Sequence, residues 1–292
     1  TYLGALQAFT MYGADFVTVP MDADGMMVDR LPEMLRSGPK FMYILPNFHN
    51  PAGVTLPLDR RQEIIRASDH YGIPIIEDDP YGQLRYEGHH IKPLVVLDAE
   101  CRECDIDSKY TGNVIYLSTF SKTLAPGLRL GWIVAPKEVI RKLVQAKQGT
   151  DLHTSMFDQI VAYEVGHGGF IDRHVVRIRE VYGRRRDVML QALERAFPDP
   201  SLGVHWTRPQ GGLFLWVEVP ESINTVELLQ DAIAEKVAFV PGVAFFPNGG
   251  GQHAMRLNFS NATEERIEEG IARLGRAIVR ALERQGTAAA MV

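Results

Sequence analysis

The feature that most constrains the fold is a series of short apolar runs separated by segments with helical spacing. These runs are residues 41–45, 73–76, 114–117 and 132–134. Between the first two runs, residues 58–71 place apolar side chains near helical spacing, and Gly72 follows as a typical helix end. Strands that are apolar on both faces and alternate with helices predict an α/β fold with a mostly parallel sheet that helices cover on both sides.

The second half of the chain has a different pattern. A long helix is expected over about residues 170–197, followed by strands at 214–218 and 255–259 and helices near 225–236 and 263–284. The arginines at 184–186 within the long helix fit a solvated helix face better than a basic ligand patch. For 292 residues we expect two domains: a large domain over 1–168, and a linking helix with a smaller α+β domain over 169–292.

Composition excludes several classes of function. The 31 basic and 36 acidic residues give a net charge of −5, without the basic excess that a nucleic-acid or anionic membrane surface needs. No run of about 18 apolar residues is present, so we expect no membrane span. The only cysteines are Cys101 and Cys104, which favours a reducing, cytoplasmic setting over a disulfide scaffold.

Polar side chains cluster directly after three of the apolar runs. They are Asn47 and Asn50 after the first, Glu77, Asp78, Asp79 and Tyr81 after the second, and Thr119, Ser121 and Lys122 after the third. In open parallel sheets, ligands bind outside the carboxyl ends of the strands. The three loops are therefore candidates for one shared site.

Lys122 is the candidate nucleophile of this site. Thr119 and Ser121 precede it, and Arg129 follows seven residues later. An arginine near a partly buried lysine disfavours the ammonium form, and a neutral amine can attack an aldehyde to form a Schiff base. The hydroxyls and the guanidinium suit a phosphate group. From spacing alone, a surface lysine near a turn explains the pattern equally well.

Three other features have more than one interpretation. Asp78 can pair with a protonated ring nitrogen while Tyr81 donates to a neighbouring oxygen. Alternatively, the carboxylate caps the loop or binds a metal. A hard metal ion, however, needs more carboxylates than this segment offers. Asn50 is either a turn former or a ligand for a cofactor oxygen. Arg256 lies in an apolar strand pattern and needs an anionic partner, either a substrate carboxylate or an internal acid.

The polar stretch over residues 98–112 is interpreted as a surface insertion. It contains Cys101 and Cys104, whose spacing is that of half a zinc site or of a redox pair. Because the sequence has no second pair, an ordinary loop is the simpler interpretation, and we predict no metal site.

Taken together, the motifs resemble those of the fold-type I pyridoxal-phosphate (PLP) aminotransferases of class I/II. The nearest branch is the 2-aminoadipate, kynurenine and aromatic aminotransferases, which are related to the catalytic domain of GntR/MocR-type transcriptional regulators. The matching segments occur in the family order and span nearly the whole chain. They are residues 50–53, 78–81, 119–122, 126–131, 211–214 and 256–260.

The resemblance implies roles around the ring of pyridoxal 5′-phosphate. Lys122 would hold the cofactor as a Schiff base and move protons during the reaction. Asp78 would pair with the pyridine nitrogen and keep it protonated. Tyr81 and Asn50 would bind the phenolic oxygen of the ring, and Tyr2 would stack on its face.

The resemblance also implies how phosphate and substrate are bound. Thr119, Ser121 and Arg129 would hold the phosphate group. Arg256, together with Asn50, would bind the carboxylate that an α-amino acid and a 2-oxoacid have in common. The implied reaction is transfer of an amino group between two such substrates, with 2-oxoglutarate as the expected acceptor.

Other functions remain open at this point. A PLP-binding effector domain of a GntR/MocR-type regulator would keep the cofactor residues, and fold alone does not exclude β-elimination or decarboxylation. The resemblance also implies a homodimer. Chains of this family begin about a hundred residues further toward the N-terminus, so we expect part of the site to come from a segment outside this sequence.

Overall fold

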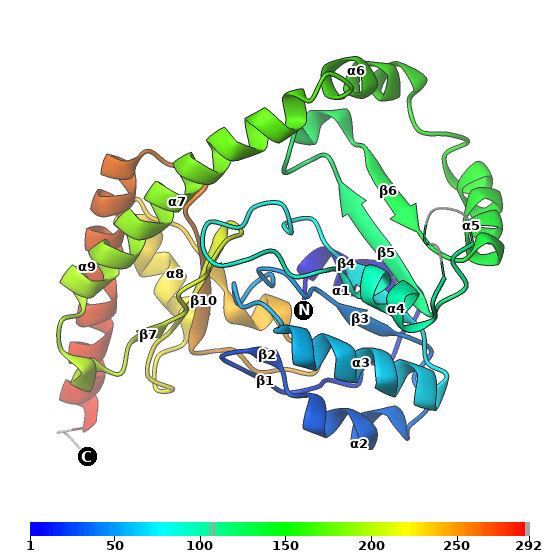
Figure 1. Cartoon of the computed structure of the whole chain (residues 1–292). Helices are drawn as coiled ribbons and strands as arrows, with labels where there is room; N and C mark the ends of the chain where they lie inside the picture. The colour runs from blue at the N-terminus through cyan, green and yellow to red at the C-terminus, as the bar shows by residue number, and fades with distance from the viewer. Residues whose placement is uncertain (105, 107–108, 290–292) are drawn as a thin grey trace. The chain divides into compact units, whose positions relative to one another are not determined.

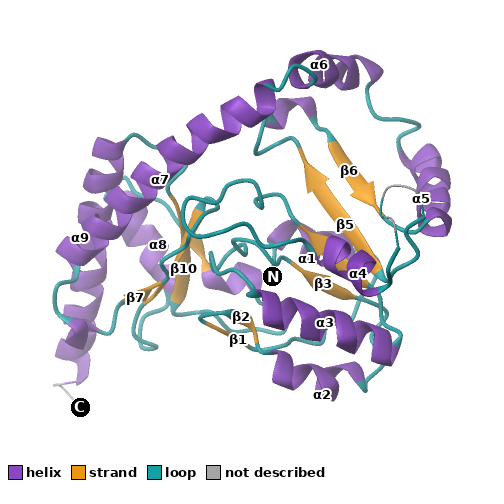
Figure 2. Cartoon of the chain, viewed as in Figure 1, coloured by secondary structure: helices purple, strands orange, loops and turns teal. Residues whose placement is uncertain are grey.

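The computed structural model describes residues 1–104, 106 and 109–289, and these form two compact units. Residues 17–49 and 55–179 form one unit, here called the parallel-sheet unit. Residues 1–16, 50–54 and 180–292 are grouped in the other, here called the terminal unit. Figure 1 follows the chain through both units, and Figure 2 shows that each contains helices and strands.

The parallel-sheet unit contains a four-stranded sheet of order β3-β4-β5-β6. Its strands are β3 (Met42–Ile44), β4 (Ile75–Asp78), β5 (Val114–Thr119) and β6 (Gly131–Val134). Its helices are α2 (Leu31–Leu35), α3 (Leu58–Tyr71), α4 (Leu94–Cys101), α5 (Lys137–Thr150) and α6 (Met156–Gly166). A small antiparallel pair, β1 (Met21–Asp22) and β2 (Gly25–Met26), precedes α2.

The core of this unit joins helices α2, α3 and α4 to strands β3, β4 and β5. Ile64 and Ile65 of α3 and Ile75 of β4 are among its fully buried side chains. Helix α3 ends as predicted, because Gly72 takes a left-handed conformation with φ 65° that a residue without a Cβ adopts without strain. Burial of these apolar side chains fixes the sheet against the helices.

A mostly parallel sheet is confirmed, with the fourth strand as the exception. Strands β3, β4 and β5 pair in parallel, whereas β6 pairs antiparallel with β5. The connection between β5 and β6 contains only turns and a 3₁₀ helix, Pro126–Leu128, and a short link without a crossover helix returns the chain antiparallel. Most residues of β6 are exposed. This edge strand is therefore not buried on both faces, contrary to what the sequence pattern had predicted for the sheet.

The stretch predicted as a surface insertion begins inside helix α4. Asp98 is only 1% exposed and accepts hydrogen bonds from the Tyr110 hydroxyl (2.5 Å) and the Asn113 amide (3.0 Å). The interpretation as an insertion on the surface was therefore wrong for Asp98 and for Tyr110, which is also buried. Residues 105, 107 and 108 of the stretch lie outside the described residues.

Cys101 is the last residue of α4 and Cys104 follows the helix; both are free thiols. Among the residues that the structure describes, no group of three or more His, Cys, Asp or Glu side chains is placed to hold a metal ion. Likewise, no helix in the described ranges is both long and apolar enough to cross a bilayer.

The terminal unit contains an antiparallel sheet of order β7-β8-β10-β9. Its strands are β7 (His205–Trp206), β8 (Phe214–Glu218), β9 (Val240–Pro241) and β10 (Ala254–Asn258), and its helices are α1 (Leu3–Thr10), α8 (Thr225–Ala234) and α9 (Glu264–Ala289). The long helix α7 (Phe170–Ala196) is shared, since residue 180 onward belongs to this unit. The predicted elements of this half are therefore present.

The arginine run of α7 is only partly a solvated face. Arg184 is exposed, but Arg186 is 5% exposed and donates a hydrogen bond to the Pro209 carbonyl (2.9 Å). The assignment of a cofactor-binding domain to residues 1–168 and a small domain to 169–292 stays a prediction.

Candidate functional site

The carboxyl edge of the parallel sheet brings together two groups of predicted residues. Asp78 is the last residue of β4 and pairs in register with Leu117 of β5. Thr119 ends β5, and Lys122 lies in the turn directly after it. Because β4 and β5 are neighbours and parallel, their carboxyl ends lie at one edge, which is where α/β sheets bind ligands.

Asp78 is half-buried and accepts a hydrogen bond from the hydroxyl of Tyr43 in β3. Burial raises the pKa of Asp78, and the neighbouring carboxylate of Asp79 acts in the same direction, whereas the Tyr43 hydrogen bond lowers it. A carboxylate in such a place gains stability from a cationic partner. Tyr43 was not predicted as a site residue, although a tyrosine in a buried strand needs a partner for its hydroxyl.

The turn after β5 is organised by its hydroxyl groups. Thr119 Oγ1 lies 2.8 Å from the Leu130 carbonyl oxygen and 2.9 Å from Ser121 Oγ. The backbone amide of Ser121 donates to Thr119 Oγ1 at 3.1 Å. Lys122, half-buried, follows directly. The two hydroxyls therefore lie together beside the candidate lysine.

Two more predicted residues belong to the same unit. Arg129 is exposed, has a left-handed backbone (φ 53°) and donates from Nη1 to the Pro126 carbonyl at 2.9 Å. Tyr81 is 4% exposed, and its backbone carbonyl accepts from the Leu84 amide at 2.7 Å. The phenol of Tyr81 is thus fixed by packing, while the side chain of Arg129 is held near its own turn.

A buried polar network supports the loop after β4, and sequence reasoning missed it. Asp79 accepts from Asn47 Nδ2 (3.0 Å), the Gly82 amide (2.9 Å) and the Tyr116 hydroxyl (3.3 Å). Arg61 is fully buried and donates to Asn47 Oδ1 at 2.7 Å. Asp79 therefore stabilises the loop that follows Asp78. The two adjacent carboxylates have different hydrogen-bond partners.

The terminal unit holds the remaining predicted residues. Arg256 in β10 donates from Nη1 to Asn50 Oδ1 at 2.8 Å. Its guanidinium lies over the Phe214 ring at 4.1 Å and near the Phe245 ring at 5.2 Å from their centroids. Asn50 is therefore more than a turn former, because its amide oxygen accepts a hydrogen bond from Arg256.

Tyr2 precedes helix α1 and is 41% exposed, so its ring retains an accessible surface. The backbone carbonyl of Tyr2 accepts from the amides of Ala5 and Leu6, both at 3.1 Å. Its side chain lies close to Gly4, where a Cβ would meet the ring at 2.7 Å. Glycine at position 4 therefore makes room for this conformation of the tyrosine.

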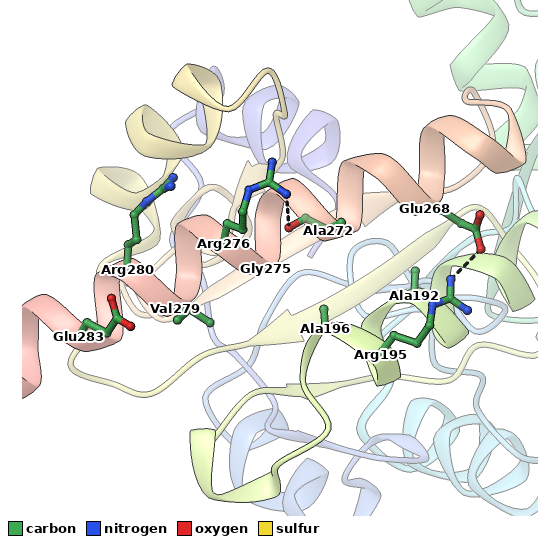
Figure 3. Close-up of a pocket in the computed structure, with 10 residues that line it drawn as sticks. All are labelled: Ala192, Arg195, Ala196, Glu268, Ala272, Gly275, Arg276, Val279, Arg280 and Glu283. Carbon is green, nitrogen blue, oxygen red and sulfur yellow. Dashed lines mark hydrogen bonds and ion pairs between the residues drawn. The ribbon is translucent and has the colours of Figure 1, made fainter.

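A separate pocket of about 470 Å³ lies between helices α7 and α9 of the terminal unit (Figure 3). It contains none of the predicted site residues. Arg195 is paired with Glu268 at 2.7 Å, and Arg276 and Arg280 are paired with Glu235 at 3.0 and 2.7 Å. Because its arginines are neutralised by these carboxylates, the pocket does not indicate a particular ligand.

Comparison with known proteins gives a consistent result. A family model described as aminotransferase class I and II matches residues 1–274. The chain is 47% identical over 284 residues to aromatic-amino-acid aminotransferase 1 of Thermococcus litoralis, covering 95% of this chain and 65% of that protein. It is 42% identical over 279 residues to 2-aminoadipate transaminase of Thermus thermophilus, covering 95% and 67%.

Among solved structures, a kynurenine aminotransferase of Pyrococcus horikoshii in complex with PMP superimposes with a TM-score of 0.89. It is 44% identical in sequence, and the match covers 97% of this chain and 68% of that one. This chain therefore spans about two thirds of the length of the proteins that it matches.

Proposed function

This chain belongs to the aminotransferase class I and II family, and from that premise we propose that it is a pyridoxal 5′-phosphate-dependent aminotransferase. It transfers an amino group between an α-amino acid and a 2-oxoacid, with 2-oxoglutarate as one acceptor. The match also confirms the predicted fold, the α/β fold of the fold-type I transferases. The observation that carries the proposal is the placement of Asp78 and Lys122 at the carboxyl ends of two neighbouring parallel strands.

The candidate site residues of the parallel-sheet unit have the chemistry that binding of this cofactor requires. When bound, pyridoxal phosphate supplies an aldehyde that joins amines and a ring that accepts electrons from the adjacent carbon. Asp78 would hold the positive charge at the ring nitrogen, since burial makes an isolated carboxylate unfavourable there. Thr119, Ser121 and Arg129 would bind the phosphate, which prefers hydroxyl and guanidinium donors.

Lys122 would hold the cofactor covalently through its amine. Its free Nζ would accept the proton from the α-carbon of the substrate as a base and, as an acid, deliver it to the cofactor carbon rather than back to the α-carbon. Tyr81 and Asn50 would bind the phenolic oxygen of the ring, and Tyr2 would pack on its face. Tyr81 is only 4% exposed, so packing restricts the movement of its side chain.

Arg256 would bind the carboxylate of both substrates. Its guanidinium is already held by Asn50 Oδ1 and by the Phe214 ring, so little side-chain freedom is lost on binding. The carboxylate is the group that an amino acid and a 2-oxoacid share. One arginine therefore serves both halves of the reaction.

We also propose that the protein works as a homodimer in a cytoplasmic setting, with residues 1–168 binding the cofactor. Helix α6 exposes Met156, Phe157, Ile160 and Tyr163, which are 64%, 74%, 53% and 66% accessible. Contiguous exposed apolar side chains mark surfaces that contact other proteins. This face supports association of two copies.

The activity is tested with purified protein, PLP, 2-oxoglutarate and a panel of amino acids that includes aromatic ones and 2-aminoadipate. We expect one glutamate for each 2-oxoacid formed. Release of ammonia or of an amine instead would indicate elimination or decarboxylation. Tight PLP binding without turnover of any common amino acid would favour the regulator alternative and contradict the proposed activity.

A further inference from the structure

Tyr43 and Asp78 are joined by a hydrogen bond between two adjacent parallel strands. The Tyr43 hydroxyl donates to Asp78 Oδ2. In the register of β3 and β4, Tyr43 lies opposite Ile76, two residues before Asp78. Alternate residues of a strand share one face, so Ile76 and Asp78 point to the same side of the sheet. The tyrosine ring thus extends along this face to the carboxylate.

The next residue, Asp79, has a different set of partners. Its carboxylate accepts from the Asn47 side chain, the Gly82 amide and the Tyr116 hydroxyl. These hydrogen bonds stabilise the loop that follows β4. The molecule therefore contains two tyrosines that each donate to one of two adjacent carboxylates, and only one of these carboxylates has a proposed role at the cofactor.

The pKa of Asp78 depends on its burial and on two neighbouring side chains. Burial raises the pKa of Asp78, the hydrogen bond from Tyr43 in β3 lowers it, and the like charge of Asp79 raises it. Lys122 follows β5, the strand on the other side of β4. Tyr43 thus opposes the effect of burial, because a hydroxyl that donates to a carboxylate stabilises its ionised form.

We propose that Tyr43 is a positioning residue that holds the Asp78 carboxylate ionised and in one orientation for the ring nitrogen of the cofactor. This inference rests on the proposed function. The hydroxyl engages Oδ2, so rotation of the carboxylate would break the bond. Tyr43 acts on the cofactor only through Asp78.

The test compares Tyr43→Phe with the matched variant Tyr116→Phe, which removes the hydroxyl that donates to Asp79. The dissociation constant of PLP is measured by equilibrium dialysis of cofactor-free protein across a pH series. We expect Tyr43→Phe to bind PLP about tenfold more weakly at neutral pH, the size expected for a lost hydrogen bond to a charged group. The pH at which binding is lost on acidification should also move upward.

Two controls separate positioning from folding. Tyr116→Phe should keep the wild-type pH dependence, and thermal unfolding shows whether each variant is folded. In an Asp78→Asn background, adding Tyr43→Phe should change neither the dissociation constant nor its pH dependence, because the carboxylate through which Tyr43 acts is gone.

The results distinguish this inference from the proposed function. If wild-type protein does not bind PLP, the proposed function fails. If wild-type protein binds PLP and Tyr43→Phe has the same pH dependence, only the role of Tyr43 is refuted. An equal loss of affinity in the Asp78→Asn background also refutes it, since Tyr43 would then act independently of Asp78.

Discussion

At the scale of single residues, Arg256 shows how the chain prepares a charged side chain for a ligand. Its guanidinium donates to Asn50 and lies over the face of Phe214. The aromatic face attracts the cation without using its hydrogen-bond donors. A planar group held in this way presents a two-pronged donor to a carboxylate.

This geometry predicts the effect of Arg256→Lys. The lysine keeps the charge but loses the fork and the stacked plane, so the KM for both the amino acid and the 2-oxoacid should rise by about tenfold to a hundredfold. Steady-state kinetics with each substrate varied in turn would measure this. Arg184→Lys in α7, where the side chain is exposed, is the matched control. An unchanged KM for either substrate would contradict the assigned role.

Sequence alone identified the residues whose type is unusual in its position. Lys122 among hydroxyls, an acid at a strand end and an arginine in an apolar strand are each visible in the pattern. Tyr43 was missed because a tyrosine within an apolar run also fits an ordinary buried strand. The hydrogen bonds of Asp79 were missed, since only the fold shows that this acid turns toward Asn47.

At the scale of elements, Glu77 of β4 determines how helix α4 begins. It is fully buried, and its Oε1 and Oε2 accept from the amides of Leu94 (2.7 Å) and Val95 (2.9 Å) in the first turn of α4. Burial raises the pKa of Glu77 to about 8, with a further contribution from Asp79. One strand side chain therefore caps a neighbouring helix.

This pKa predicts a dependence of stability on pH. The folded state binds the proton more tightly than the unfolded chain, so the stabilising contribution is complete below about pH 4.5 and is lost as the pH rises through about 8. Glu77→Gln stays neutral, so its free energy of unfolding should fall less over this range than that of the wild type. Urea unfolding at several pH values measures the difference.

Glu33→Gln, an exposed position in α2, is the control for that series and should follow the wild type. Parallel curves for Glu77→Gln and wild type would mean that Glu77 does not titrate in this range. The link between burial and proton binding at this position would then be wrong.

Sequence reasoning located several elements that bury one side in the core, although it missed helices α2 and α4, which also carry buried residues. The long helix α7 and strands β8 and β10 were predicted close to their observed bounds. Helix α5 was missed because none of its residues is buried, so no side of it carries a core pattern. The antiparallel direction of β6 follows from the short connection between β5 and β6. The spacing of apolar residues gives no information about that connection.

At the scale of the whole molecule, the grouping of distant segments follows from long-range contacts. Asn50 belongs to the terminal unit, where it meets Arg256 more than two hundred residues later. Local patterns cannot show such a grouping. Family resemblance supplied what they could not, because the order of motifs identifies a fold even where single elements are missed.

The exposed face of α6 predicts the assembly state. Replacing Phe157 and Ile160 together with serine should shift a dimer toward monomer, because these side chains are exposed in a single chain. Sedimentation velocity over a concentration series would detect the shift. Serine at Val226, an exposed apolar position in α8, should leave the dimer intact. A monomeric wild type would contradict the proposed homodimer.

The most direct test of the whole account is the site of cofactor attachment. Protein loaded with PLP is reduced with borohydride, digested and examined by peptide mass spectrometry. The account predicts a phosphopyridoxyl group on the peptide that contains Lys122, and its absence in Lys122→Ala. Attachment to a different lysine, or an unchanged modification in Lys122→Ala, would contradict the assignment of Lys122 and with it the proposed mechanism.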